Sequence, residues 1–191
     1  MQSVSLAKLG YSVKAIDFNR QLLSELQHNC HGLEVEVIED DIRSFTKYAN
    51  PQPGLVTCCG DTILHLESRD DVNRLIRDCA GVLAPGGKLV LSFRDYSNEL
   101  SGGNRFIPVK SDENRILTCC LDYGSDKLLV TDLFHFRVGN GWQQKVSSYY
   151  KLRIVPDEIA DMITQNGLKI SSDEIVNGFV TIIAELPHPY L

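Results

Sequence analysis

Carboxylates that follow short apolar runs are the residues of this chain best placed for chemistry. Asp17 closes an apolar run over residues 11–17, and the helix-like segment before that run stops at Gly10. Both oxygens of a carboxylate accept hydrogen bonds, so Asp17 is suited to a pair of vicinal hydroxyl groups such as those of a ribose. The alternative is that Asp17 caps the helix that begins near Asn19.

Two further acidic positions follow apolar runs in the same way. Asp41 and Ile42 come after a strand-like run over 35–38. A second run over 54–59 ends at Cys59 and leads into Gly60 and Asp61. Asp41 can accept a hydrogen bond from the amino group of an adenine while Ile42 packs on the ring, or it can be a solvated turn residue. Because open α/β sheets bind ligands at the carboxyl ends of their strands, we expect these residues at one sheet edge.

Arg94 is the cation with the most informative position. It directly follows an apolar run over 88–93 and stands two residues before Tyr96. The planar guanidinium matches a carboxylate with two parallel hydrogen bonds, so this position predicts a site for a small acidic molecule. Arg94 could instead pair with Asp95 or Glu99 at the surface.

The aromatic candidates each have two interpretations. His65 could face an active site, or it could be a packed histidine on the helix expected after residues 54–59. Tyr149 and Tyr150 alternate along a strand, so at most one of them points into a site, and both could be ordinary sheet residues. Trp142, next to an Asn-Gly turn, is interpreted as a packing residue.

The elements that would position these side chains alternate between strand and helix up to Arg94. Helical periodicity predicts helices over 19–28 and 70–83, the second stopped by Pro85 and the glycines after it. Strands that alternate with helices at this spacing predict an α/β fold, with a mostly parallel sheet covered by helices on both faces.

The rhythm changes after Tyr96. A polar loop is expected over 97–108, and strands over 115–121, 128–138 and 144–154 are separated by glycine-bearing turns, which predicts an antiparallel meander. A helix over 156–166 and strands over 168–171 and 179–185 follow. The chain is therefore expected to be a single domain over residues 1–191, with an insert over 97–154.

Composition limits the classes of partner. The net charge of −6 and the pI near 5.3 disfavour nucleic acid, and no apolar run approaches the roughly 20 residues of a membrane span. The N-terminus does not have the pattern of a signal peptide. None of the six cysteines is spaced as Cys-x-x-Cys, so they are interpreted as small buried hydrophobic residues in a reducing cytoplasm. Oligomeric state is left open.

Taken together, these motifs make the sequence similar to the class I S-adenosylmethionine-dependent methyltransferases over nearly its whole length. The resemblance rests on the acid Asp17, the Asp41-Ile42 pair, the Cys59-Gly60-Asp61 turn and the segment 83–90. It implies a Rossmann-like doubly wound sheet with the antiparallel meander inserted after the family's fifth strand. Such families begin with a strand and a glycine-rich turn that would precede Met1, so that first strand is expected to be absent from this sequence.

A narrower resemblance is to the glycine and sarcosine N-methyltransferase group. It is carried by the run Gly60–His65, by Arg94 to Tyr96, and by the Tyr149-Tyr150 pair, whereas Asp61 and Thr62 depart from that group's amide and serine. In that group an arginine at the place of Arg94 holds the substrate carboxylate. The resemblance thus implies a small-molecule acceptor, possibly an amine or amino acid with a carboxylate.

The resemblance also implies a set of site residues, without a certain catalytic residue and without a metal. The implied contacts to S-adenosylmethionine are Asp17, Phe18, Asp41, Ile42, Cys59, Gly60 and Asp61, and the implied contacts to the acceptor are His65, Arg94, Tyr96 and Tyr150. Transfer from a sulfonium is a one-step displacement, to which alignment alone contributes about 7–11 kcal/mol.

Two other functions are compatible with parts of the sequence. Without the family's first strand, which would bury several side chains worth about 1.5–3 kcal/mol each, the chain could be a truncated, non-catalytic remnant or a partner-binding protein. An NAD-dependent dehydrogenase would use Asp17 in the same way. The Asp41-Ile42 pair, the Gly60-Asp61 turn and the meander favour methyl transfer over hydride transfer.

Overall fold

The computed structural model of the chain describes residues 2–188, which form two compact units divided between Pro53 and Gly54. Met1, which the resemblance places after the family's glycine-rich turn, and residues 189–191 of the expected domain lie outside the described residues. Among the residues described, no helix is long and apolar enough to cross a membrane.

The first unit is a two-stranded parallel sheet with helices. Its elements are α1 (Gln2–Lys8), β1 (Val13–Asp17), α2 (Arg20–Asn29), β2 (Val35–Glu39) and the 3-10 helix η1 (Ile42–Tyr48). Gly10 turns the chain between α1 and β1 at φ +90°, a conformation that favours glycine. The side chain of Asn19 caps α2, and Leu23 and Leu26 on its inner face are buried.

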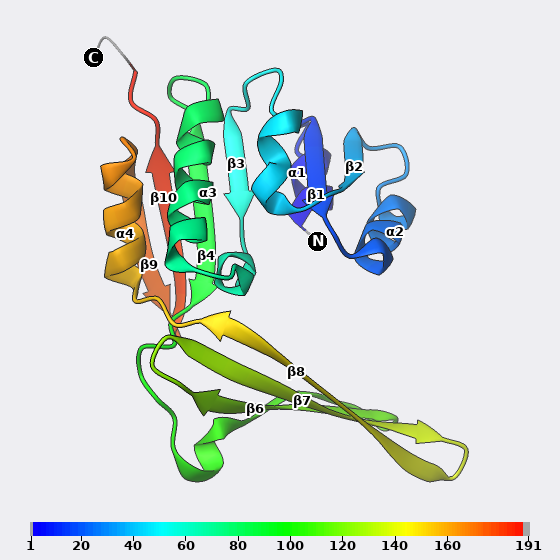
Figure 1. Ribbon diagram of the computed structural model, residues 1–191. Helices are drawn as coiled ribbons and strands as arrows, with labels where there is room; N and C mark the ends of the chain where they lie inside the picture. The colour runs from blue at the N-terminus through cyan, green and yellow to red at the C-terminus, as the bar shows by residue number, and fades with distance from the viewer. Residues whose placement is uncertain (1, 189–191) are drawn as a thin grey trace. The chain divides into compact units, whose positions relative to one another are not determined.

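The second unit contains a mixed four-stranded sheet, in the order β3-β4-β10-β9. Its elements are β3 (Leu55–Cys58), the 3-10 helix η2 (Thr62–His65), α3 (Arg69–Val82), β4 (Lys88–Arg94), α4 (Pro156–Gln165), β9 (Lys169–Val176) and β10 (Phe179–Glu185). Figure 1 shows α3 and α4 side by side against this sheet. Fully buried Phe93, Ile76, Ile159 and Ile182 form part of the core between them.

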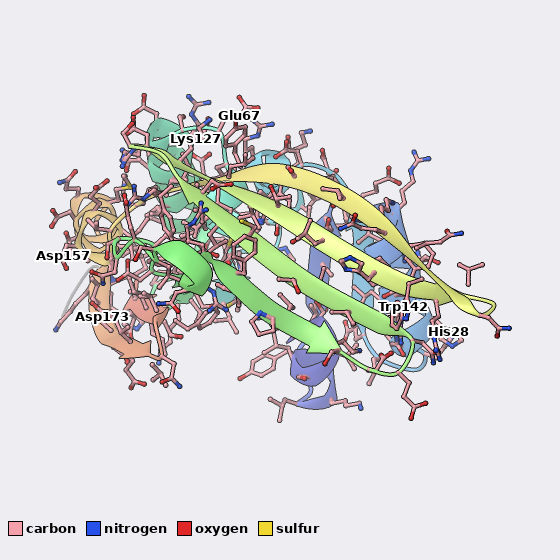
Figure 2. All side chains as sticks on the ribbon, turned by 90° about the horizontal axis from the view of Figure 1, so that it is seen from below. His28, Glu67, Lys127, Trp142, Asp157 and Asp173 are labelled. Atoms are coloured by element: carbon pink, nitrogen blue, oxygen red, sulfur yellow. The ribbon has the colours of Figure 1, made fainter. Side chains whose placement is uncertain are left out.

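The inserted region of the second unit is an antiparallel sheet in the order β5-β6-β7-β8. Its elements are the 3-10 helix η3 (Gly102–Arg105), β5 (Phe106–Ser111), β6 (Arg115–Tyr123), β7 (Lys127–Val138) and β8 (Gly141–Leu152). Figure 2 shows that Lys127 and Trp142 mark opposite ends of the long β7–β8 hairpin. The end at Lys127 is the buried one, where Leu128, Val130 and Leu121 pack.

The structure differs from the sequence prediction at several elements. Part of the expected loop over 97–108 is strand, because β5 pairs with β6 from Phe106 onward. His65 lies in η2 and not on a regular helix. The β1–β2 sheet is parallel, but the four-stranded sheet is mixed and not mostly parallel: β3 and β4 are parallel, whereas β10 is antiparallel to both of its neighbours. The tight turn at Asn177 and Gly178 makes β9 and β10 a hairpin, which requires antiparallel pairing.

The cysteines are less uniformly buried than the sequence suggested. All six are free thiols; Cys30 and Cys79 are buried, whereas Cys58, Cys59, Cys119 and Cys120 are only half-buried. Burial is the main cause that raises the pKa of Cys58 to about 12, so this thiol is protonated and inert at neutral pH.

Candidate functional site

The carboxyl ends of β1 and β2 form the first candidate region. The two strands are in register with Asp17 opposite Glu39, so Asp17 and the segment after β2 reach the same edge of their sheet. Asp17 Oδ1 accepts a hydrogen bond from the backbone N–H of Asn19 at 2.8 Å, and no bond to Asp17 Oδ2 is found within residues 2–188. Phe18 beside it is 75% exposed. Asn19, and not Asp17, caps α2, which removes the capping alternative for Asp17.

Asp41 lies at the same edge but is already paired. Its carboxylate accepts from the Arg43 side chain, with Nη2–Oδ2 at 2.6 Å and Nε–Oδ1 at 3.0 Å, and from the Arg43 backbone N–H at 2.8 Å. These hydrogen bonds hold the pKa of Asp41 below its ordinary value. Both partners remain about two-fifths exposed, so solvent weakens the pair and a ligand can replace it. Ile42, next to Asp41, is half-buried.

The turn after β3 is the second candidate region, and it lies within the second unit. Gly60 and Asp61 both have left-handed backbones, with φ +78° and +70°. For Asp61 this conformation is uncommon and needs support from its surroundings. The support comes from β4, because Ser92 Oγ accepts from the Gly60 N–H at 3.1 Å and the Ser92 carbonyl accepts from the Asp61 N–H at 3.3 Å.

The carboxylate of Asp61 is the centre of a buried hydrogen-bond cluster. Oδ1 accepts from the backbone N–H of Arg94 at 2.5 Å, and Oδ2 accepts from Lys151 Nζ at 2.6 Å and from the Tyr96 hydroxyl at 3.4 Å. Asp61 and Lys151 are only 9% and 8% exposed, although they stand 90 residues apart in the chain. The Asp61 side chain therefore fixes the end of β4 and joins it to β8.

Arg94 itself is free to bind an anion. Its backbone N–H is held by Asp61, whereas its guanidinium is exposed and has no hydrogen bond or ion pair within the described part of the chain. The surface alternatives are occupied otherwise: Asp95 accepts from the Ser97 N–H, and Glu99 pairs with Arg153 at 2.8 Å. Burial raises the pKa of Tyr96, so its hydroxyl stays protonated beside Asp61.

The two tyrosines of β8 lie on opposite faces, as their alternation requires. The ring of Tyr149 lies 5.4 Å from the ring of His65, and Lys151 Nζ lies 5.9 Å from the centre of the Tyr149 ring. Tyr150 is 62% exposed on the other face, away from this cluster. The structure thus brings Tyr149, and not Tyr150, to His65. Partial burial, and then the charge of Lys151, lower the pKa of His65, so its imidazole is neutral at pH 7.

Sequence reasoning missed three residues of this region: Ser92, Lys151 and Asp132. Lys151 carried a usable signal, since it is two residues from Tyr149 and must share its face of the strand. Ser92 and Asp132 carried none, because the strand register that brings them to Asp61 and Cys119 is a tertiary feature. Among the residues described, no group of three His, Cys, Asp or Glu side chains could hold a metal ion.

Comparison with known proteins shows that this chain is similar to methyltransferases. Residues 2–87 match the methyltransferase domain family. The chain is 39% identical over 94 residues to a ubiquinone biosynthesis O-methyltransferase of Xanthomonas euvesicatoria, which covers 47% of this chain and 37% of that protein. It is 26% identical over 175 residues to the putative methyltransferase YqeM of Bacillus subtilis, covering 88% of this chain and 69% of that protein.

A glycine/sarcosine N-methyltransferase of Aphanothece halophytica is also related, but only distantly. It is 25% identical over 103 residues, or 53% of this chain and 39% of that protein. The narrower resemblance therefore has weak support, while the methyltransferase relationship expected from the motifs has support from all three relatives. The chain aligns with well under half of the length of the first and third of them.

Solved structures of methyltransferases share the fold. The CcbJ methyltransferase of Streptomyces caelestis aligns with a TM-score of 0.80 at 16% identity, over 95% of this chain and 77% of that one. CalS10, an amino pentose methyltransferase of Micromonospora echinaspora with S-adenosylmethionine bound, aligns with a TM-score of 0.74 at 16% identity, over 91% and 73%. At this identity the likeness shows a Rossmann-like methyltransferase fold.

Proposed function

We propose that this chain, whose residues 2–87 match the methyltransferase domain, transfers a methyl group from S-adenosylmethionine to a small molecule that carries an acid group. The observation that carries the acceptor part is the Arg94 guanidinium, which is exposed at the carboxyl end of β4 without an ion pair among the described residues. Ligands of open α/β sheets bind at such strand ends.

The first unit offers groups that fit the nucleoside part of the cofactor. Asp17 has an oxygen available for the ribose hydroxyls, and exposed Phe18 offers an apolar surface beside it. Asp41 can exchange its exposed pairing with Arg43 for the adenine amino group, and Ile42 can pack on the ring. In the second unit, the backbone of Cys59 and Gly60 lies at the carboxyl end of β3.

The Asp61 carboxylate has a different role in this proposal from the one the sequence suggested. Because its oxygens already accept from Arg94, Lys151 and Tyr96, it acts as a positioning residue and not as a ligand of the cofactor. It holds the backbone of Arg94 in place, which restricts the positions that the guanidinium can reach. Such preorganisation lowers the entropic cost of binding an acidic substrate.

Bound S-adenosylmethionine would supply an electrophilic methyl group on a sulfonium, which an acceptor lone pair attacks directly. The protein then needs to bind, align and shield the acceptor. Arg94 binds the acid group, and the Tyr149 hydroxyl on the His65 side of β8 is available to orient the acceptor. The neutral imidazole of His65 would add no further positive charge to a site that binds a sulfonium.

The test combines cofactor binding with an acceptor screen. Calorimetry with S-adenosylhomocysteine should show saturable binding to the wild-type chain. A screen of small amines, amino acids and phenols with S-adenosylmethionine, read out as S-adenosylhomocysteine formed, should favour acceptors with a carboxylate. Arg94→Lys should raise KM for those acceptors by roughly tenfold or more while the cofactor Kd stays the same, because a point charge cannot replace the guanidinium fork.

Arg77→Lys on α3 is the matched control, since Arg77 is also exposed and, within residues 2–188, forms only a long pair with its neighbour Asp78. It should leave both constants unchanged. If the best acceptors lack an acid group and Arg94→Lys equals wild type on them, Arg94 is not a substrate residue, and the acceptor class is wrong although methyl transfer survives. Failure to bind S-adenosylhomocysteine at all would instead favour a non-catalytic, partner-binding role for the chain as given.

A further inference from the structure

Asp132 on β7 is a carboxylate with little support from the protein. It is half-buried, and Cys119 Sγ on the neighbouring strand donates to its Oδ1 at 2.8 Å. No other hydrogen bond and no ion pair to this side chain is found within residues 2–188. A thiol is a weak donor, so most of the hydrogen-bonding capacity of the carboxylate remains open.

The strand register places Asp132 on the same face of the inserted sheet as Tyr149 and Lys151. Asp132 pairs with Ser147 and Val130 pairs with Tyr149, so Asp132 and Tyr149 are diagonal neighbours on one face of the sheet. Lys151 shares that face because it is two residues from Tyr149. Burial is the largest cause of the raised pKa of the Tyr149 hydroxyl, and the negative charge of Asp132 also raises it.

The cations around Asp132 leave it without a partner of its own. Lys151 is held by Asp61 at 2.6 Å, and Arg94 presents an exposed guanidinium. Burial and then the hydrogen bond to Asp132 raise the pKa of the Cys119 thiol to about 12, although the charges of Lys151 and Arg94 act to lower it. The thiol therefore stays protonated and donates, and Asp132 remains the anion of the pair.

We propose that Asp132 binds the amino group of the methyl acceptor, so that the acceptor is an amine that also carries the acid group bound by Arg94. This inference rests on the proposed function and makes its substrate class narrower. Arg94 and Asp132 both act on the Cys119 thiol, so a cation and an anion lie on one side of the second unit and match the two charges of an amino acid. The hydroxyl of an acidic alcohol or phenol could donate a hydrogen bond to Asp132, but it would not bring the positive charge of an ammonium group.

The chemistry of the step agrees with a carboxylate at this position. The acceptor amine loses a proton to solvent and donates one N–H to Asp132, which leaves its lone pair directed away from the carboxylate. The lone pair forms the N–C bond to the methyl group as the C–S bond breaks, and the bonding pair stays on sulfur, which becomes a neutral thioether. Nitrogen gains positive charge in the transition state, so a nearby anion favours the transition state over the neutral amine.

The first arm of the test changes the ligand and needs no variant. Glycine should be compared with glycolate, and alanine with lactate, because each pair keeps the carboxylate and exchanges the amine for a hydroxyl; methylamine keeps only the amine. With the wild-type chain, kcat/KM should be at least about tenfold higher for the amino acid of each pair, as expected when a charge-assisted hydrogen bond to Asp132 is replaced by a weaker one from a neutral hydroxyl.

The second arm removes the charge of Asp132. Asp132→Asn should lower kcat/KM for the amino acids by about 10- to 100-fold, lower it much less for the hydroxy acids, and leave the Kd of S-adenosylhomocysteine unchanged. Asp173→Asn is the control of equal charge, since Asp173 is exposed on β9, away from the inserted sheet (Figure 2). Thermal unfolding of both variants checks that they fold.

The outcomes separate this inference from the proposed function. Equal turnover of hydroxy acids and amino acids, or an Asp132→Asn variant as active as wild type on amino acids, overturns the role of Asp132 and leaves Arg94 untouched. An equal loss on both acceptor classes also overturns it, because the effect would then be structural. If the wild type methylates no acidic acceptor, the proposed acceptor class fails and this inference fails with it.

Discussion

The two candidate regions hold their charged groups in opposite ways. At the carboxyl edge of β1 and β2, Asp41 pairs with Arg43 only two residues away, and both side chains are about two-fifths exposed. Around the turn after β3, Asp61 pairs with Lys151 from 90 residues away, and both are almost completely buried. The first arrangement can exchange its partner for a ligand, whereas the second can only hold the framework together.

Energetics explains this division. An exposed ion pair contributes about 0–1 kcal/mol because water competes for both charges. Breaking a buried pair by removing one partner costs about 3–5 kcal/mol, since the remaining charge loses both water and partner. A site that binds and releases a ligand needs exposed ion pairs, which can be exchanged, at the ligand. It needs buried ion pairs in the framework that holds the site.

The largest expected effect is the loss of the buried cation. Lys151→Met keeps most of the side-chain volume and leaves Asp61 without its closest donor, so the free energy of unfolding of the second unit should fall by about 3–5 kcal/mol. Urea unfolding, followed by a probe in that unit, measures the change.

The double variant Asp61→Asn/Lys151→Met sharpens this prediction. It removes both charges and should recover part of the loss, because no uncompensated charge remains buried. A Lys151→Met variant as stable as wild type would mean that water solvates the Asp61 carboxylate, and the contrast between the two regions would disappear.

The same contrast explains what could be read from the sequence. The positions of Asp17, Asp41 and Arg94 at or just after the carboxyl ends of strands could be predicted, because strand ends are local features of the pattern. The orientation of Tyr149 against that of Tyr150 could not be decided, since alternation gives two faces without saying which one is inward. The contacts of Ser92 and Asp132 depend on which strands pair and in what register, and a single sequence does not determine that.

The fold shows the same limit. The helices and most strands lie within a few residues of the predicted ranges because periodicity is a local property. The mixed character of the α/β sheet was missed, as was β5, because the pairing of β10 between β4 and β9 and of β5 with β6 is made by residues distant in sequence.

The second effect in size concerns the ligand in the exposed region. Asp17→Ala should weaken S-adenosylhomocysteine binding by about 1.5–3 kcal/mol, the range for hydrogen bonds to a charged group, and should leave stability nearly unchanged. Calorimetry measures the Kd. Glu34→Ala is the control, since Glu34 is an exposed acid at the amino end of β2 in the same unit. Undiminished affinity in Asp17→Ala would remove that residue from the ribose site.

A smaller effect is expected from the exposed ion pair. Arg43→Gln should change the free energy of unfolding by no more than about 1 kcal/mol, against the several kcal/mol of the buried pair. The hydrogen bonds from Arg43 are the main cause of the lowered pKa of Asp41, so this pKa should rise toward its ordinary value in the variant. NMR titration of the carboxyl carbon would show the shift. A large loss of stability would contradict the view that this edge is free to exchange partners.

The smallest effect is the pH dependence at His65, a partly buried residue of the second unit. Partial burial and the charge of Lys151 lower the pKa of this imidazole below 6.5, so the folded protein binds a proton less readily than the unfolded chain. Stability from this group is therefore complete above about pH 6.5 and is lost as the pH falls from there toward the folded pKa.

An NMR titration of the His65 ring tests the cause directly. Lys151→Met removes the nearby cation and exposes the influence of Asp61, so the pKa of His65 should rise in that variant, while Arg43→Gln in the other unit should not move it. An unchanged pKa in Lys151→Met would show that burial alone lowers it. In that case the buried pair acts only on the framework, and its charge does not reach the face on which the acceptor is proposed to bind.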